Sequence, residues 1–483
     1  MTLKQKTVSG VIWSIFDSFA SNGIQFIVGI ILARILSPRE FGLIGMLTIF
    51  IALSQSFIDS GFTNALIRKK DCTQTDYSTV FYFNFVIGII FYFILFFFAG
   101  SISAFFNEPQ LELLLQVLGL GLILNALGMI QRTILTKNIN FKLQTRISVV
   151  ASTLSGVIAI SVAYNGFGVW SLVVLTLSRF GFTSIFLWMW AKWKPSLIFS
   201  IESFKDLFSF GSKLLISGLI DTAYRNVYYL IIGKYFSAVE LGYYTRADQF
   251  QALPSKQLTG IFGRVSYPIL STIQDDVTKL RTAYTQIIKT TMFITFVLML
   301  GMSAIAKPMI ITLIGEQWLP SVIYLQMLCF VGMFYPLHAL NLNMLQIQGR
   351  SDLFLRLEII KKALSIPIII IGIIYGIKIM ILGMMLHTII AYFINSFWSG
   401  KFIGYSSFEQ VKDIFPSFLL AFTMAVIVFI IGNIIDLSNI GILVTQIITG
   451  AIITIILAEI FKLNSYLDLK EIIFNKLGIQ KIK

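Results

Sequence analysis

The chain has 483 residues; 57% are hydrophobic, only 12% are charged, and the formal net charge is +14. A soluble domain carries about 25% charged residues, so this composition excludes an ordinary soluble protein and predicts a membrane protein. The basic residues sit at the ends of apolar runs rather than in one patch, and Cys72 and Cys329 lack metal-ligand spacing, so neither nucleic-acid binding nor a metal site is indicated.

Apolar runs of about 20 residues, the length that crosses a bilayer, recur along the whole chain. The first follows Lys4 and Lys6 and continues to about Leu36 with no small-residue cleavage site, so we expect a retained helix and not a signal peptide. We predict fourteen spans, near residues 11–36, 41–63, 79–100, 111–131, 146–164, 167–190, 210–236, 240–262, 287–306, 320–346, 359–376, 379–402, 416–434 and 440–461.

Lysine and arginine accumulate in the cytoplasmic connections of such chains and so indicate orientation. If the N-terminus is cytoplasmic, most of the 37 basic residues fall on that side. The opposite side then receives only Arg34, Arg39, Lys234, Arg246, Lys307 and Lys378. We therefore predict that both termini are cytoplasmic.

Two turns on the outer side of this arrangement share a pattern. Arg34–Gly42 reads Arg-Ile-Leu-Ser-Pro-Arg-Glu-Phe-Gly, and 200 residues later Lys234–Gly242 reads Lys-Tyr-Phe-Ser-Ala-Val-Glu-Leu-Gly. The first string joins predicted spans one and two, and the second joins spans seven and eight. Each repeat therefore holds six spans, and the even number makes the repeat parallel, as in transporters that place substrate between two halves.

The repeat predicts an all-α fold of two six-helix bundles with two extra C-terminal helices. Its expected parts are an N-terminal lobe at 1–195, a C-terminal lobe at 196–408, and two further spans with a tail at 409–483.

Several motifs resemble those of bacterial polysaccharide exporters, the lipid-linked oligosaccharide flippases of the multidrug/oligosaccharidyl-lipid/polysaccharide superfamily. Ile31–Leu43 is similar to the first loop of that family, and Asp59–Lys69 with Ser78-Thr-Val80 is similar to its colanic or teichuronic acid subgroup. The second half matches through Arg225-Asn226, Ile232-Gly233-Lys234, Gly242–Ala247 and Leu253-Pro254. The chain departs from the pattern at Tyr228, where many relatives have an acidic residue, which leaves the coupling ion open.

The resemblance implies a flippase of the bacterial inner membrane for undecaprenyl-diphosphate-linked sugars, with no enzymatic chemistry and no cofactor. The sequence agrees that no nucleotide is used, because it has no G-x-x-x-x-G-K-[ST] loop to hold phosphates. Its partners would be a lipid-linked oligosaccharide, membrane lipids and a coupling proton or sodium ion.

Charged residues inside the spans are the candidate site, since an arginine at mid-membrane costs at least about 3 kcal/mol. Arg225, Arg179 and Lys256 are expected to line a cationic cavity for diphosphate or acidic sugars, with Asn226 beside them and Arg246 at the rim. Asp17 and Asp221 lie near equivalent positions of the two repeats and are the predicted ion-coupling sites.

A structural interpretation stays open for these residues. Asp221 and Arg225 are spaced i,i+4 and share one helix face, so they could pair only to stabilise a bundle. Lys256 could snorkel to the interface, and Asn226 could form an interhelical hydrogen bond. Two other function classes also remain: an ion-coupled multidrug exporter, which should have an acid-rich cavity, and a membrane enzyme, which should have a large outside loop with clustered catalytic residues.

Overall fold

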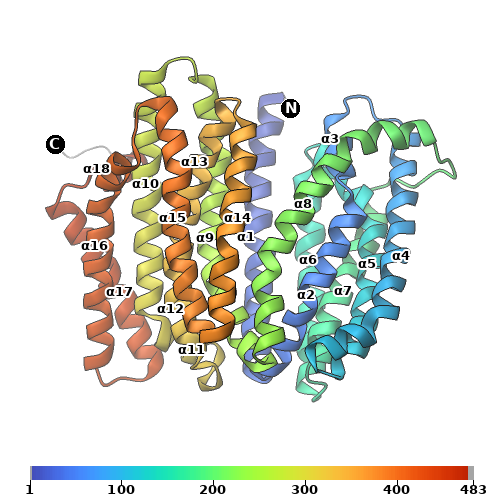
Figure 1. Ribbon diagram of the computed structural model, residues 1–483, viewed down its shortest axis with the longest axis horizontal. Coiled ribbons are helices and arrows are strands. Elements are labelled where there is room, and N and C mark those ends of the chain that lie inside the picture. The colour runs from blue at the N-terminus through green and yellow to red at the C-terminus, as the bar shows by residue number, and fades with distance from the viewer. Residues whose placement is uncertain (1–2, 477–483) are drawn as a thin grey trace. The chain divides into compact units, whose positions relative to one another are not determined.

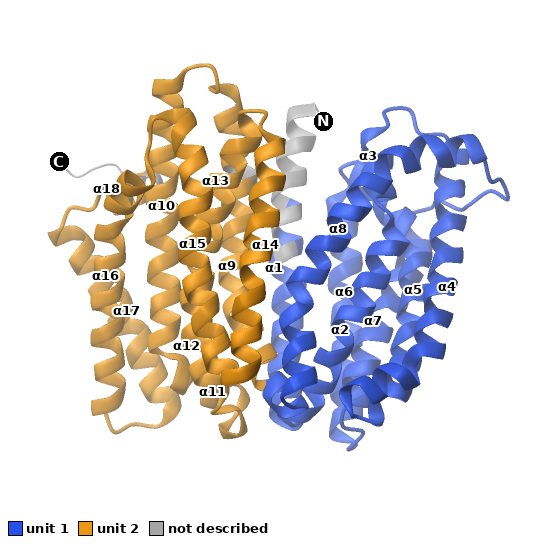
Figure 2. Cartoon of the chain, viewed as in Figure 1, with its two compact units in different colours: residues 1–242 blue, residues 243–483 orange. Residues whose placement is uncertain are grey.

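The computed structural model describes residues 3–476, with side chains except at 3–12, 14, 15, 18, 264, 265 and 472–476. The chain forms two compact units, residues 1–242 and 243–483 (Figure 2). The described residues contain helices and no strand, which confirms the all-α prediction (Figure 1). Among the basic residues used for orientation, the side chains of Lys4, Lys6, Arg264 and Lys476 and the tail beyond residue 476 lie outside the described residues.

Unit 1 contains helices α1 to α8 and the first residues of α9. The most extensive packing joins α4 with α5, α6 with α7, α1 with α6, α5 with α7, and α2 with α8. The bounds are α1 Leu3–Ile35, α2 Pro38–Asp59, α3 Phe62–Arg68, α4 Gln74–Phe106, α5 Gln110–Lys137, α6 Phe141–Tyr164, α7 Trp170–Trp190 and α8 Ile201–Tyr235.

Unit 2 holds the remaining helices and is itself all-α. Helix α10 packs on α16, α14 on α15, and α16 on α17. The bounds are α9 Ala238–Thr272, which begins in the last residues of unit 1, α10 Val277–Ala304, α11 Ala306–Ile314, η1 Glu316–Trp318, α12 Ser321–Gly332, α13 Tyr335–Ile347, α14 Ser351–Tyr375, α15 Ile377–Ile403, α16 Ser407–Ile434, α17 Asn439–Ile460 and α18 Asn464–Lys476.

Each predicted span falls on a helix, and the span at 320–346 is divided between α12 and α13. Ten helices of the described chain are long and apolar enough to cross a membrane: α2 with α3, α4, α5, α6, α7, α10, α12 with α13, α15, α16 and α17. Helices α1, α8, α9 and α14 fall outside that set. Helices α8 and α9, which carry Asp221, Arg225 and Lys256, are outside it because charged and polar side chains lower the mean hydropathy of a span. In α1, the apolar part within the described residues is Phe19–Ile35.

The compact units divide at Gly242 and not near residue 195. The reason is that α8 packs on α2, α3 and α4 of unit 1. The lobes expected from the repeat describe sequence equivalence rather than packing, and they stay a prediction.

The two repeated turns contact each other through their glycines. A Cβ atom on Gly42 would lie 1.6 Å from the carbonyl oxygen of Ala238, and one on Gly242 would lie 1.9 Å from that of Pro38. Since residues 38 and 238, like 42 and 242, are equivalent in the repeat, the contact is reciprocal. Reciprocal contacts are what a two-fold relation produces, so this crossing supports the repeat. It also explains why both strings end in glycine, since no larger residue fits.

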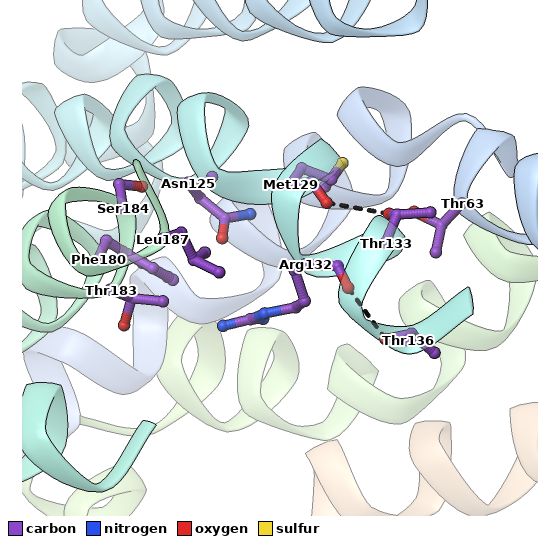
Figure 3. A pocket seen from close by; sticks show the side chains of 11 residues that line it. Thr63, Asn125, Met129, Arg132, Thr133, Thr136, Phe180, Thr183, Ser184 and Leu187 are labelled. Atoms are coloured by element: carbon purple, nitrogen blue, oxygen red, sulfur yellow. Dashed lines mark hydrogen bonds between the residues drawn. The ribbon is translucent and has the colours of Figure 1, made fainter. Parts of the chain in front are cut away.

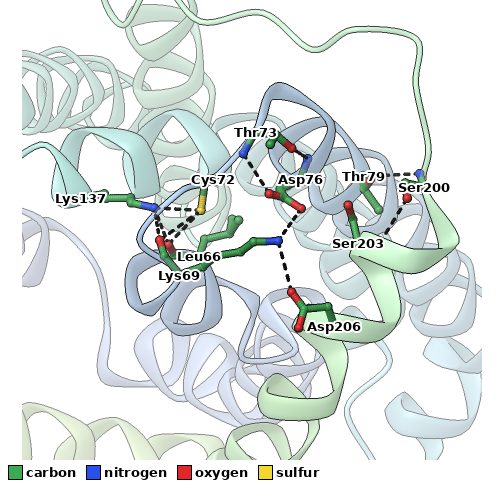
Figure 4. Close-up of polar contacts among 10 residues, drawn as sticks. All are labelled: Leu66, Lys69, Cys72, Thr73, Asp76, Thr79, Lys137, Ser200, Ser203 and Asp206. Carbon is green, nitrogen blue, oxygen red and sulfur yellow. Dashed lines mark hydrogen bonds and ion pairs between the residues drawn. The ribbon is translucent and has the colours of Figure 1, made fainter.

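A polar cluster fixes the start of α8 (Figure 4). It lies beside α3, at the end of unit 1 opposite these turns (Figure 1). Lys69 bonds Asp76, which is 1% exposed, at 3.0 Å and Asp206 of α8 at 3.2 Å. Partial burial disfavours the charge of Lys69, but its hydrogen bonds to the two carboxylates outweigh burial and raise the pKa of Lys69. Lys137 donates to the Leu66 carbonyl at 3.0 Å. Together these bonds tie α8 to α3, α4 and α5.

Candidate functional site

A cavity of about 200 Å³, with both polar and apolar lining, lies in unit 1 between α5 and α7 (Figure 3). Its lining is mostly hydroxyl and amide side chains around one cation: Thr63, Asn125, Gly128, Met129, Arg132, Thr133, Thr136, Phe180, Thr183, Ser184 and Leu187. Arg132 reaches from α5 toward the side lined by Phe180 and Thr183 (Figure 3). Part of the Arg132 side chain is in contact with solvent, but protein atoms surround its guanidinium group. Both are expected of a side chain in a recess.

Helix periodicity places this polar face on α5. Asn125, Met129, Arg132, Thr133 and Thr136 recur at intervals of three or four residues, so they share one side of the helix. Figure 3 shows them along the same stretch of α5. The resulting stripe is able to face a cavity while the rest of α5 packs.

Close packing of α7 on α5 closes one wall of the cavity. A Cβ atom on Gly128 would lie 2.8 Å from Ser184 Oγ, so glycine permits the approach. The Ser184 hydroxyl donates to the Leu124 carbonyl across the contact. This bond fixes α7 and with it the neighbouring residues Phe180 and Thr183.

A second arginine lies next to the cavity, one turn before Thr183. Arg179 donates to Gln25 Oε1 of α1, and its guanidinium lies 5.6 Å from the Phe180 ring centre. Arg179 and Arg132 are close enough to repel each other, and Arg132 is attracted by Asp17 of α1. Within the described part of the chain, neither arginine has a carboxylate at ion-pair distance. The group of two cations and one acid therefore favours an anion.

The structure thus brings together three charged residues. The sequence analysis singled out Arg179 and Asp17, but it did not single out Arg132. The predicted span 111–131 ends just before Arg132, which placed Arg132 in the following cytoplasmic connection. Helix α5 instead continues to Lys137 and carries Arg132 inside it. The polar stripe that begins at Asn125 was the signal that could have identified Arg132.

Helix α8 carries the predicted pair Asp221 and Arg225. Arg225 Nε lies 2.8 Å from Asp221 Oδ2, and the two side chains are 70% and 45% exposed for Arg225 and Asp221, respectively. Asn226 donates to the Thr222 carbonyl at 2.8 Å, and Thr222 Oγ1 lies 3.1 Å from Ser56 Oγ on α2. Asn226 is therefore bonded to its own helix, while the ion pair is accessible. If α8 crosses the membrane as predicted, an arginine this exposed is expected to face water rather than lipid.

Two further basic residues predicted in the second half, Lys256 and Arg246, belong to unit 2. Lys256 is exposed on α9, and among the described residues it has no ion-pair partner. Arg246 is only 7% exposed, and its guanidinium lies 5.9 Å from the ring centre of the fully buried Trp318. The protein therefore holds Arg246 in place, and a role at the rim of a cavity stays a prediction.

Unit 2 contains a polar cluster that the sequence did not predict. Lys361 is 9% exposed and pairs with Glu358. His387 Nε2 lies 2.8 Å from the Lys361 carbonyl oxygen, and His338 Nε2 lies 2.9 Å from Thr388 Oγ1. These contacts satisfy the histidines within the fold. Among the described residues, no group of three or more His, Cys, Asp or Glu is placed to hold a metal ion.

Comparison with known proteins identifies a family that covers more than half of the chain. Residues 31–323 match the model of the family described as polysaccharide biosynthesis protein. The chain is 26% identical to the teichuronic acid biosynthesis protein TuaB of Bacillus subtilis over 73% of each chain. It is also 26% identical to the lipopolysaccharide biosynthesis protein WzxC of Escherichia coli over 89% of each chain.

The fold is similar to that of solved transporters. The lipid II flippase MurJ in an inward closed conformation aligns with a TM-score of 0.75 at 17% identity, covering 96% of this chain and 99% of that chain. An inward-facing multidrug transporter of the MATE family aligns with a TM-score of 0.64 at 17% identity, covering 80% and 94%. At these identities the likeness describes the fold alone.

Proposed function

Because the chain belongs to the polysaccharide biosynthesis protein family, we propose that it is a flippase for lipid-linked oligosaccharides. It carries undecaprenyl-diphosphate-linked units across the bacterial inner membrane for surface polysaccharide export, with both termini in the cytoplasm. The names of its relatives, which concern teichuronic acid and lipopolysaccharide biosynthesis, support a saccharide cargo. The MurJ-like fold supports flipping as the mode of transport.

The observation that carries this proposal is the cation pair Arg132 and Arg179 beside a cavity lined by hydroxyl groups. A diphosphate loses its water as it enters the membrane, and an unpaired buried charge is very costly. Arginine offers a planar fork of N–H donors to phosphate oxygens. Thr133, Thr136 and Thr183 add hydroxyl groups that can contact phosphate or sugar. The polyprenyl tail stays in the lipid, and alternating access moves the head group.

The Asp221–Arg225 pair provides a way to couple transport to an ion. In the absence of substrate, each side chain neutralises the other. When a phosphate of the substrate forms an ion pair with Arg225, Asp221 loses its own ion-pair partner. A proton or sodium ion then binds the Asp221 carboxylate and neutralises its charge. Asp17 attracts Arg132 without forming an ion pair with it, and it is the second acid that a proton or sodium ion could compensate. Coupling through these two acids requires no nucleotide.

A multidrug exporter is the alternative with the same fold, since MATE transporters also align. Such a protein favours organic cations and would need an acid-rich cavity. The cavity in unit 1 has Arg132 in its lining, and no carboxylate is among its lining residues. The charge of the site therefore favours an anionic substrate and disfavours the drug exporter.

The test is transport by the full-length protein in liposomes that contain an undecaprenyl-diphosphate-linked oligosaccharide. Flipping is measured by the access of an impermeant sugar-modifying reagent. A hydrogen bond to a charged group contributes about 1.5–3 kcal/mol, so Arg132→Ala should slow flipping roughly 10- to 100-fold. Arg132→Lys should recover only part of the rate, because it keeps the charge and loses the fork.

Lys205→Ala is the matched control, since it removes an exposed cation from the start of α8, outside the cavity. It should flip at the wild-type rate. Equal rates for wild type and Arg132→Ala would contradict the role of the cavity. Absence of flipping by the wild type, together with export of cationic drugs, would favour the alternative.

A further inference from the structure

A second recess, of about 520 Å³, opens on unit 1 at the end that holds the α1–α2 turn. Three turns surround it: α1–α2 at residues 36–37, α4–α5 at 107–109 and α6–α7 at 165–169. Its lining combines two aromatic rings with a guanidinium, a carboxylate and an amide: Ser37, Arg39, Glu40, Gln110, Leu113, Leu114, Gly166, Phe167, Gly168, Val169 and Trp170. The recess is separate from the Arg132 cavity, because the two share no lining residue.

The aromatic side of the recess is held open to solvent by the α6–α7 turn. Gly166 and Gly168 have φ angles of +81° and +53°, a conformation that glycine adopts at low cost. The turn that they form presents Phe167, which is 60% exposed. Among the described residues, neither Phe167 nor Trp170 stacks on another aromatic ring. Two rings are thus available to a ligand in the recess.

The polar side of the recess is preorganised by bonds between the turns. Arg39 of α2 pairs with Glu108 at 2.5 Å and reaches Gln110 Oε1 at 3.5 Å. Glu40 accepts from the Ser37 backbone N–H at 2.6 Å. Its other oxygen, Oε1, lies against the α6–α7 turn, since a Cβ atom on Gly168 would be 2.4 Å away. Donor and acceptor groups therefore stand in fixed positions beside the rings.

We propose that this recess binds a pyranose residue of a carbohydrate. A pyranose ring has an apolar C–H face, which fits an aromatic ring, and an edge of hydroxyl groups that both donate and accept. Phe167 and Trp170 provide the platform, and Arg39, Glu40 and Gln110 provide partners for the hydroxyls. Ligand sites of this size combine an apolar lining with a few fixed polar groups.

The charges of the recess select a neutral sugar over a free anion. Glu108 neutralises Arg39, and Glu40 adds a carboxylate. A phosphate or uronate would therefore meet no uncompensated cation, in contrast to the cavity around Arg132. This difference assigns the sugar to the recess and the phosphate to the cavity.

The place of this site in transport rests on the proposed function and on the predicted orientation, which puts the three turns outside. There the recess would hold a sugar that has already crossed the membrane. Holding it would slow return of the oligosaccharide to the cavity. Loss of the recess should then reduce net export while the phosphate contacts stay intact.

The test is saturation-transfer NMR on the full-length protein in lipid nanodiscs, with free cellobiose as the probe. Wild type should transfer saturation to the ring C–H protons of cellobiose. An aromatic contact contributes about 0.5–1.5 kcal/mol, so Trp170→Leu and Phe167→Ala should each weaken binding roughly 2- to 10-fold. Tyr164→Ala is the matched control, because Tyr164 is 74% exposed near the same turn but does not line the recess.

Equal transfer in wild type and both variants, or none in wild type, would overturn the sugar site. Displacement by glucuronate or inorganic phosphate at lower concentration than cellobiose would instead indicate an anion site and also overturn it. The melting temperature of each variant verifies that it is folded. Arg132→Ala should bind cellobiose like wild type, so failure of the flippase proposal and failure of the sugar site give different results.

Discussion

Replacing Gly42 by alanine tests the contact between the two repeated turns. The new Cβ atom would lie 1.6 Å from the Ala238 carbonyl oxygen, a separation that real structures do not show. The blocking group is the Ala238 backbone carbonyl, which cannot move aside as a flexible side chain can. The first turns of α2 and α9 must therefore move apart by more than about 1 Å. Overpacking usually costs about 1–3 kcal/mol, and a backbone obstacle places this variant near 3 kcal/mol.

Thermal unfolding in detergent, followed by the fraction of monodisperse protein, measures the effect. For a unit of this size about 1 kcal/mol corresponds to roughly 2–4 °C, so Gly42→Ala should lower Tm by about 6–12 °C. Gly242→Ala should behave similarly, because its Cβ atom would lie 1.9 Å from the Pro38 carbonyl oxygen. The double variant should cost clearly less than the sum, since one separation relieves both contacts.

Gly218→Ala is the control within the same unit. No atom lies within 4 Å of a Cβ at this helical position, and alanine is the better helix former by about 1 kcal/mol. Its Tm should therefore stay the same or rise. A Gly42→Ala protein as stable as wild type, or strict additivity of the two glycine variants, would refute the reciprocal contact.

Three further predictions concern charged groups. Asp221→Asn should weaken the dependence of flipping on a proton or sodium gradient, measured in liposomes with each gradient collapsed in turn, because Asp17 is still present; unchanged dependence would rule out Asp221. Lys69→Met should lower Tm by more than Asp206→Asn, because the Asp206 side chain is 64% exposed and surface ion pairs contribute little; equal shifts would contradict this assignment. Hydrogen bonds from the backbone and side chain of Lys279 hold the pKa of Asp276 below its usual value, so its stabilisation is present above about pH 4 and is lost as pH falls through the lowered value. The Tm difference between wild type and Asp276→Ala should therefore shrink in acid, whereas a constant difference would oppose it.

Sequence reasoning predicted the family and the helices because their signals are local or compositional. Apolar runs of membrane length mark the spans, and strings such as Arg34–Gly42 carry the family resemblance, which the match over residues 31–323 confirms. The candidate site was predicted less completely. Arg179 and Asp17 stood out as charges within spans, but Arg132 lies near a helix end, where a basic residue is ordinary.

What the sequence by itself determined is the all-helical membrane fold, the repeat at Gly42 and Gly242, and the presence of charged residues of both signs inside the predicted spans. Only the tertiary structure decided which of these charges meet. Arg132 lies near Arg179 of another helix, and the recess lined by Phe167 and Trp170 joins three turns, the first and last of which are separated by more than a hundred residues. The physical reason is that helix periodicity follows from neighbouring residues, whereas a cavity depends on how distant helices pack.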